Sequence, residues 1–127
     1  MFDSTNQFHS RSKKYLTSLH TCFSNEVLDR VFFLSKSLAT AWQNDQHVFI
    51  CGNGGSAANA LHIANDLLYG VGSCGQPPEV KGIKVEALSS NTGILTCLAN
   101  DTGYENIYSK QLSVKSNPGD LLIILSG

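Results

Sequence analysis

The first part of the chain contains two stretches in which apolar residues recur with the period of an amphipathic helix. Between residues 7 and 23 the apolar positions lie three, four or seven residues apart, which predicts a helix with a polar outer face. Ser24 or Asn25 is expected to cap a second helix, whose apolar face runs from Val27 to Trp42. This face is wider than contact with one sheet requires, which favours burial against another subunit. The simpler interpretation, a helix that only covers a sheet, stays open.

After residue 46, short apolar runs alternate with helical segments. Three apolar runs predict strands: residues 48–51, residues 83–88 and Leu121–Leu125. Three helices are predicted between these strands: residues 56–69, a segment capped at residues 90–92 that runs to Leu98, and residues 104–114. Such alternation indicates an α/β domain with a parallel sheet and right-handed crossovers. Because the last strand is apolar throughout, we expect helices on both of its faces and strands on both of its edges.

The first strand runs directly into a glycine-rich turn, Gly52-Asn53-Gly54-Gly55, which precedes a helix. Glycines there can adopt positive φ and leave backbone N–H groups uncovered, and Ser56 is placed to cap the helix. Uncovered N–H groups at a helix N-terminus bind anions. The turn therefore predicts a phosphate or carboxylate site near Ser56.

Comparison of the glycine turn with known phosphate-binding loops indicates which kind of phosphate compound it suits. A P-loop requires a lysine after its glycines, and no lysine occurs between Lys36 and Lys81. The dinucleotide fingerprint also fits poorly, because Ala57 stands where its third glycine belongs and no acidic residue marks the end of the second strand. A loop that holds a phosphosugar through backbone N–H groups and Ser and Asn side chains fits better.

Composition and charge exclude several classes of function. The net charge of −1, without a basic face that carries aromatic residues, argues against a nucleic-acid partner. No apolar segment reaches the ~20 residues that span a bilayer, and the polar N-terminus does not resemble a signal peptide. We therefore expect a cytoplasmic protein without a membrane partner. The four cysteines are widely spaced and lack a C-x-x-C pair, which predicts reduced, mostly buried thiols.

Two pairs of polar residues are candidates for chemistry. His62 and Asp66 are four residues apart on the helix after the glycine turn, so their side chains share one helix face. This spacing suits two metal ligands, or an imidazole oriented by a carboxylate, although most such pairs are surface contacts. Their position after a phosphate loop favours a chemical role. Asn100 and Asp101 are explained equally well as part of a turn that caps the next helix.

Three separated motifs resemble the sugar isomerase (SIS) domain family, in particular its phosphoheptose isomerase group. The first motif comprises residues 51–60, His62 and residues 64–67. The second comprises residues 98–101 together with Gly103 and Tyr104. The third runs from residues 118–120 through Ile124 to Ser126 and Gly127. Their order and spacing agree with this group over about residues 48–127. The resemblance is specific because all three motifs agree.

The resemblance implies a Rossmann-like parallel sheet with flavodoxin-like strand order, flanked by helices and preceded by two N-terminal helices. Residues 1–46 would be a helical pair for oligomerisation and packing, and residues 47–127 the phosphosugar-binding SIS domain. Members are usually homotetramers with sites between subunits. The family enzyme converts sedoheptulose 7-phosphate into glycero-manno-heptose 7-phosphate, by zinc-assisted proton transfer through an enediol.

The resemblance also suggests site residues, which add to the anion site near Ser56. Substrate-binding positions would be Asn53, Gly54, Gly55, Ser56, Asp66, Asn100, Asp101, Ser126 and Gly127. Zinc would be bound by His62 and Asp66, and Asp66 would also be the catalytic base. The family has Glu at this position, and an Asp places its carboxylate about 1 Å short, a misplacement that can cost ~100-fold in rate.

The later Gln and His that complete the family's zinc site are not among residues 1–127. A catalytic zinc normally has three protein ligands. We therefore expect these residues to be the front part of a longer chain, an SIS domain lacking its last strands and helices and inactive by itself. The alternative is a non-catalytic SIS module that binds a phosphosugar or a protein partner, resembling the replication-initiation relatives. Those relatives lack an acidic residue at the position of Asp66, which favours the enzyme.

Overall fold

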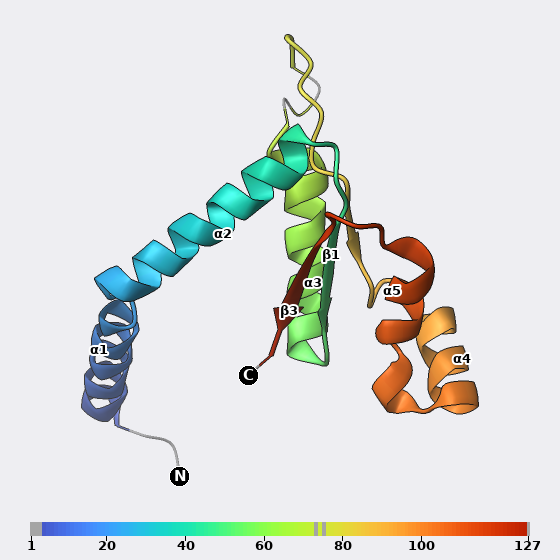
Figure 1. Ribbon diagram of the computed structural model, residues 1–127. Helices are drawn as coiled ribbons and strands as arrows, with labels where there is room; N and C mark the ends of the chain where they lie inside the picture. Colours follow the sequence, from blue (N-terminus) through green and yellow to red (C-terminus); the bar gives the residue numbers. More distant parts are fainter. Residues whose placement is uncertain (1–3, 73, 75, 127) are drawn as a thin grey trace. The chain divides into compact units, whose positions relative to one another are not determined.

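The computed structural model describes residues 4–72, 74 and 76–126, which form an α/β fold (Figure 1). Contacts divide the chain into two compact units, Met1–Lys36 and Ser37–Gly127, and the boundary falls inside the second helix. The division at residue 46 between a helical pair and a phosphosugar-binding domain stays a prediction.

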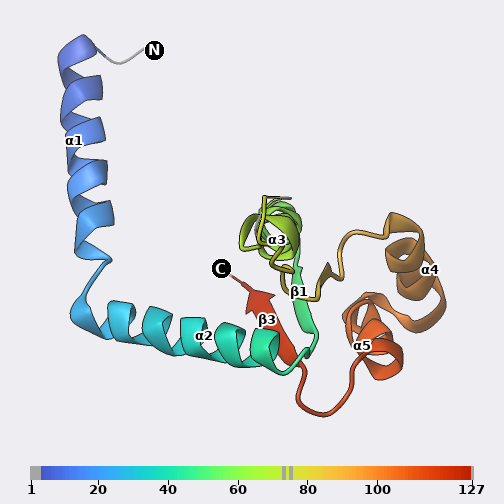
Figure 2. The same cartoon turned by 90° about the horizontal axis from the view of Figure 1, so that it is seen from above.

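The N-terminal helices are α1 (Thr5–Thr21) and α2 (Asn25–Gln43), seen from above in Figure 2. Ser4 begins α1 with a capping box, because its hydroxyl accepts from the Gln7 N–H and the Gln7 side chain accepts from the Ser4 N–H. Ser24 Oγ accepts a backbone N–H of the first turn of α2 at 3.3 Å, so Ser24 is a cap of that helix. Within the part of the chain that the structure describes, no helix is both long enough and apolar enough for a membrane crossing.

The apolar faces of these two helices are exposed in the described structure. α1 has no buried residue. Large exposed apolar side chains on or beside the two helices are Phe8, Tyr15, Leu16, Leu19, Phe23, Val27, Leu28, Val31, Phe32, Phe33 and Leu34. The amphipathic pattern that predicted the two helices thus leaves a large apolar surface without cover.

One parallel sheet lies in the second unit, with strand order β2-β1-β3. Its strands are β1 (Val48–Gly52), β2 (Val85–Ala87) and β3 (Leu121–Leu125). Val48 pairs with Val85 on one side and with Leu121 on the other, and all five residues of β1 are buried. This confirms the parallel sheet and its flavodoxin-like order. The central position of β1 explains why its sequence is apolar on both faces.

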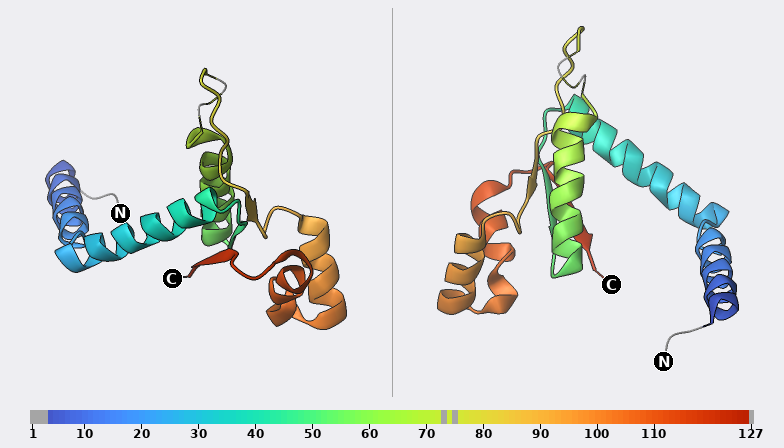
Figure 3. Two further views of the ribbon diagram at one scale, coloured as in Figure 1. Left: turned by 45° about the horizontal axis from the view of Figure 1, so that its top comes forward. Right: turned by 180° about the vertical axis from the view of Figure 1, so that it is seen from behind.

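The two faces of β1 pack against different helices, as Figures 1 and 3 show. The remaining helices of this unit are α3 (Gly55–Asn65), α4 (Thr92–Thr102) and α5 (Ser109–Lys115), of which α3 and α5 cover β1. On one face Val48 and Ile50 pack with α3 and with the last turns of α2. On the other face Phe49 and Cys51 form a separate cluster that Tyr108, at the start of α5, helps to cover. The alternation of side chains along β1 therefore builds two small cores.

β3 is covered on one face among the described residues. Leu121 and Ile123 pack on the α3 side, whereas Leu122 is 40% exposed and Ile124 is 65% exposed on the opposite face. Of the described strands, only β1 pairs with β3. The prediction of helices on both faces and strands on both edges is therefore met on one face and one edge only, because α5 covers the cluster on β1 and not β3.

The N-terminus of α3 differs from the prediction. Gly54, at φ 57°, is the N-cap, and it makes no side-chain hydrogen bond, so Ser56 lies inside the helix. The prediction that Ser56 caps this helix is wrong, because a glycine already supplies the positive φ at the helix start. The α-helix ends at Asn65, and a π-helical turn, Asp66–Gly70, follows it.

α4 is longer than predicted and contains Asn100 and Asp101. The Asn91 side chain caps it by accepting the Ile94 N–H at 3.1 Å, and Gly103, at φ 94°, ends it. The prediction that Asn100 and Asp101 form a turn is therefore wrong. The segment expected to be helical from residue 104 begins with a 3₁₀ turn, Tyr104–Asn106, and α5 follows only at Ser109.

The four cysteines are free, as expected of reduced thiols. Cys51 is buried in β1, and burial raises the pKa of its thiol. Cys22, Cys74 and Cys97 are exposed, so the prediction of mostly buried cysteines is wrong. Only Cys51 lies in an apolar strand, and the other three lie on helices or loops.

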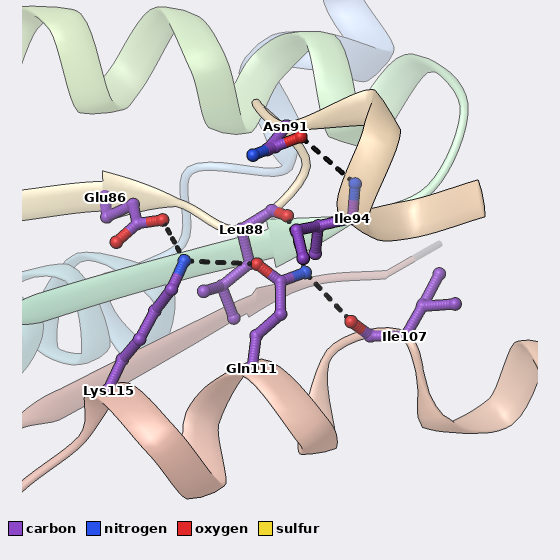
Figure 4. Close-up of polar contacts among 7 residues, drawn as sticks. All are labelled: Glu86, Leu88, Asn91, Ile94, Ile107, Gln111 and Lys115. Atoms are coloured by element: carbon purple, nitrogen blue, oxygen red, sulfur yellow. Dashed lines mark hydrogen bonds and ion pairs between the residues drawn. The ribbon is translucent and has the colours of Figure 1, made fainter. Parts of the chain in front are cut away.

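A polar network fixes α5 against the end of β2 (Figure 4). The buried Gln111 donates from Nε2 to the carbonyl oxygens of Leu88, at 3.0 Å, and Ile107, at 2.9 Å. Lys115 Nζ donates to a Glu86 carboxylate oxygen and to Gln111 Oε1. Because these contacts satisfy the Leu88 carbonyl, they hold the segment that leaves β2 and leads into α4.

Asp120 joins the turn before β3 to the residue before β1. One carboxylate oxygen accepts the His47 N–H and the other the Asn117 N–H, each at 2.8 Å. The hydrogen bond from Asn117, followed by that from His47, holds the pKa of this carboxyl below its ordinary value. The ionised Asp120 carboxylate therefore stabilises the folded state at pH values above about 4, the pKa of this group in the unfolded chain. This stabilisation is lost as the pH falls through the lower pKa of the folded state.

Asp120→Asn is expected to lower the free energy of unfolding by about 1 kcal/mol at neutral pH, because an amide has one acceptor oxygen for two N–H groups. Urea unfolding at neutral pH and at about pH 3 measures this difference. We expect the difference to shrink at the lower pH. Asp29→Asn on α2 is the control. An equal effect of both substitutions, or a difference that grows on acidification, would contradict the role of Asp120.

Candidate functional site

The carboxyl ends of the three strands lie at one edge of the sheet, where ligands bind in open α/β folds. The glycine turn follows β1 there, and Ser126 follows β3. Gly52 pairs with Leu125 in this ladder, so residues separated by about half the chain's length meet at one place. Gly127 lies outside the described residues.

The glycine turn has a defined backbone geometry. Gly54 adopts φ 57° and ψ −122°, the Ser56 N–H donates to the Asn53 carbonyl at 3.0 Å, and the Ala57 N–H donates to the Gly54 carbonyl at 3.1 Å. These bonds use two of the N–H groups at the start of α3. Among the described residues, the Gly54 and Gly55 N–H groups have no hydrogen-bond partner, so they can donate to a ligand.

Two adjoining cavities lie at this edge of the sheet. A cavity of about 500 Å³ is lined by the turn residues Gly52, Asn53 and Gly55 together with Tyr108. A cavity of about 370 Å³ is lined by Asn59, His62 and Ile63 of α3. Both are also lined by the same four residues, namely Ser56, Ile124, Leu125 and Ser126. One elongated ligand can therefore reach from the glycine turn to His62.

His62 and Asp66 lie together on the solvent side of α3. His62 Nε2 is 3.5 Å from Asp66 Oδ2, and the two side chains are 78% and 59% exposed. Two ligands of one tetrahedral zinc ion lie about 3.3–3.6 Å apart, given bonds of about 2.0–2.2 Å. The pair therefore fits two positions of a zinc site. The described residues contain no cluster of three His, Cys, Asp or Glu side chains, so they do not complete such a site.

Asn100 and Asp101 lie apart from the two cavities in this chain. Both are exposed on α4, where Asn100 Nδ2 donates to Asp101 Oδ1 at 2.8 Å. The Cys97 thiol lies 3.5 Å from the other Asp101 oxygen, and this contact raises the pKa of Cys97. Asp66 also lines neither cavity, although its partner His62 does. Of the predicted site residues, the two cavities are lined by Asn53, Gly55, Ser56, His62 and Ser126.

Asn59 and Tyr108 bring polar side chains to these cavities, and neither was among the predicted site residues. Asn59 lies three residues after Ser56 and three before His62, so the helical period places all three on one face. Helical spacing was thus a signal for Asn59. Tyr108 reaches the turn from the residue before α5, with its hydroxyl 2.5 Å from the Gly52 carbonyl oxygen. No local pattern indicates such a contact across 56 residues of sequence.

Comparison with known proteins agrees with this geometry. The phosphoheptose isomerase of Geotalea daltonii is 34% identical over 120 residues, which are 94% of this chain and 57% of that protein. The phosphoheptose isomerase of Sulfurimonas denitrificans is 35% identical over 115 residues, 90% of this chain and 56% of that protein. The chain thus spans about half the length of the curated relatives it matches.

Solved structures show the same fold. The structure of phosphoheptose isomerase from Neisseria gonorrhoeae matches with a TM-score of 0.73 and 27% identity, and the match covers 96% of this chain and 61% of that one. A family model described as the SIS domain matches residues 13–127. Because this match covers most of the chain and the sheet has the expected strand order, the chain belongs to the SIS domain family.

Proposed function

We propose that this chain carries the phosphosugar-binding part of an aldose–ketose isomerase that converts sedoheptulose 7-phosphate into glycero-manno-heptose 7-phosphate. The observation that carries the proposal is the pair of adjoining cavities, which connects the glycine turn with His62. Relatives named phosphoheptose isomerase support the choice of substrate. His62 lies seven residues after Gly55, about 10 Å along the helix axis. An extended seven-carbon sugar phosphate can span such a distance.

In this proposal the phosphate accepts hydrogen bonds from the Gly54 and Gly55 N–H groups and from the Ser56 hydroxyl. The sugar then follows the exposed face of α3 past Asn59. Asp66 takes a proton from the sugar carbon next to the carbonyl and returns it to the former carbonyl carbon. A second proton moves from the neighbouring hydroxyl to the carbonyl oxygen, so that the carbonyl changes place through an enediol. Asn100, Asp101, Ser126 and Gly127 remain proposed substrate contacts, and the first two would act in the site of another subunit.

We also propose zinc as the cofactor, held by His62 and Asp66 together with a ligand that the described residues do not supply. A bound zinc ion would polarise the carbonyl and stabilise the oxyanion. The exposed apolar faces of α1 and α2 support association of several copies, for which we propose a homotetramer. A cytoplasmic location, without nucleic-acid or membrane partners, completes the proposal.

A non-catalytic SIS module that binds a phosphosugar is the second candidate. The observation that favours it is the presence of only two suitably placed metal ligands among the described residues. The Asp66 carboxylate favours the enzyme instead, because a binding module needs no base beside His62.

Turnover of sedoheptulose 7-phosphate tests the proposal. The chain itself is compared with a chimera in which it replaces the corresponding part of the Geotalea daltonii relative, after light scattering has given the number of copies in each. We expect four copies and chelator-sensitive turnover from the chimera. We expect no turnover from the chain alone, because its described residues offer two of the three ligands of a catalytic zinc.

Two outcomes would contradict this proposal. Isomerisation by the chain alone would refute the argument about the incomplete zinc site. Phosphosugar binding without product from the chimera, with or without added zinc, would favour the binding module. His62→Ala in the chimera is the matched variant for the chelator experiment, since it removes one proposed ligand and leaves the glycine turn intact.

A further inference from the structure

The Tyr108 hydroxyl contacts two groups of the glycine turn. Its oxygen lies 2.5 Å from the Gly52 carbonyl oxygen and 3.1 Å from the carboxamide Oδ1 of Asn53. The ring is part of the cluster formed by Phe49 and Leu88, so packing sets the position of the hydroxyl. Burial raises the pKa of Tyr108 above its ordinary value of about 10, so the hydroxyl keeps its hydrogen at neutral pH.

A phenol hydroxyl has one hydrogen, so it cannot donate fully to two acceptors. The shorter contact, to the Gly52 carbonyl, takes that hydrogen. The second contact is then satisfied only if the Asn53 carboxamide turns its NH₂ group toward Tyr108, since an amide's oxygen and nitrogen are assigned from the hydrogen-bond network. In this orientation the hydroxyl oxygen accepts a hydrogen bond and the amide oxygen points away from Tyr108.

We propose that Tyr108 is a positioning residue, which orients the Asn53 carboxamide so that its oxygen, and not its NH₂ group, meets the ligand. Asn53 lines the cavity of about 500 Å³ beside the Gly55 N–H donor. An amide oxygen accepts hydrogen bonds but cannot donate one, so it binds a sugar hydroxyl beside the phosphate and adds nothing to the binding of the phosphate itself. Tyr108 thereby favours a polyol phosphate over inorganic phosphate. This inference rests on the phosphosugar site proposed above.

The experiment measures affinity for sedoheptulose 7-phosphate and for inorganic phosphate separately, with this chain and its Tyr108→Phe variant, by two-dimensional ¹H–¹⁵N NMR. Phe keeps the packed ring and removes only the hydroxyl. We expect the dissociation constant for the sugar phosphate to rise about 5- to 10-fold, as for loss of one hydrogen bond. The dissociation constant for inorganic phosphate should change less than about 2-fold in the same variant. Tyr69→Phe is the control, since it loses a hydroxyl-to-carbonyl contact away from the turn, to Cys74.

A double variant shows whether Tyr108 acts through Asn53. Asn53→Ala should weaken sugar-phosphate binding to a similar degree, and Tyr108→Phe added to it should bring almost no further loss, because coupled residues are not additive. Additive losses would overturn the inference. Equal weakening of both ligands by Tyr108→Phe, or no weakening of either, would overturn it as well, since the hydroxyl would then only hold the turn.

The side-chain NH₂ signals of Asn53 separate this inference from the proposed function. If the unchanged chain binds neither ligand, the proposed phosphosugar site fails, yet these signals still report the contact with Tyr108. We expect one NH₂ hydrogen to show a small temperature coefficient in the unchanged chain, and its signal to shift in Tyr108→Phe but not in Tyr69→Phe. Signals at the position of a free amide, unaffected by Tyr108→Phe, would overturn the inference.

Discussion

Asp66→Glu is expected to raise isomerisation by the chimera up to about 100-fold, whereas Asp66→Asn should lower it by at least about 100-fold. The reason is the reach and charge of the proposed base. A Glu extends the carboxylate by about 1 Å toward the sugar carbons, and a misplacement of that size can cost about 100-fold in rate. An Asn keeps the size of the side chain but cannot accept the proton. Initial rates with sedoheptulose 7-phosphate, measured at saturating substrate, give both values.

The position of Asp66 in the structure makes this test specific. The residue lies at the end of α3, where the π-helical turn Asp66–Gly70 begins, and its side chain is 59% exposed. A change of length at an exposed carboxylate does not disturb a core, so rates and not folding should respond. Asp29→Glu on α2 is the matched control. If Asp66→Glu is no faster than the unchanged chimera, the shorter side chain already reaches the sugar. If Asp66→Asn keeps full activity, Asp66 is not the base.

Gly52→Ala is expected to lower the free energy of unfolding by about 3 kcal/mol and to weaken phosphosugar binding strongly. A Cβ atom on Gly52 would lie 2.7 Å from Ser56 Cβ and 2.9 Å from the Leu125 carbonyl oxygen. One neighbour is the start of α3 and the other is the paired strand β3, so neither can move without displacing the turn. Urea unfolding measures the stability, and NMR titration with sedoheptulose 7-phosphate measures the binding.

Gly55→Ala is the matched control for this substitution. A Cβ on Gly55 would meet no atom within 4 Å, and Gly55 is the first residue of α3, where Ala is acceptable. We expect stability equal to that of the unchanged chain or higher by about 0.5 kcal/mol. Equal stability of Gly52→Ala and Gly55→Ala would show that the end of β1 does not approach α3 and β3 this closely.

Much of the fold was predictable because its signals are local. The apolar run at the first strand predicted burial on both faces, and β1 is the central strand with Val48 and Phe49 in separate cores. The period of apolar residues predicted both N-terminal helices. Helix boundaries were less predictable, since Ser56 and Asn100 each suit a cap or a helix interior. A glycine at φ 57° and another at φ 94° decided where these helices begin and end.

The candidate site likewise contains features that were predictable from the sequence and features that were not. The glycine turn and the His62 to Asp66 spacing follow from neighbours in sequence, because a turn or one helical period brings such residues together. Their assignment to substrate or zinc stays a prediction. Sequence spacing did not indicate that Asn100 and Asp101 would lie apart from both cavities in this chain.

The sequence by itself determined which residues form the glycine turn, that His62 and Asp66 share one helix face, and that the strands are parallel. Only the tertiary structure decided what surrounds the turn. Pairing of β1 with β3 brings Ser126 to it, and packing of the Tyr108 ring brings a hydroxyl to Gly52 and Asn53. The physical reason is that sheet pairing and side-chain packing join residues far apart in the chain, whereas sequence patterns report only the local period of the backbone.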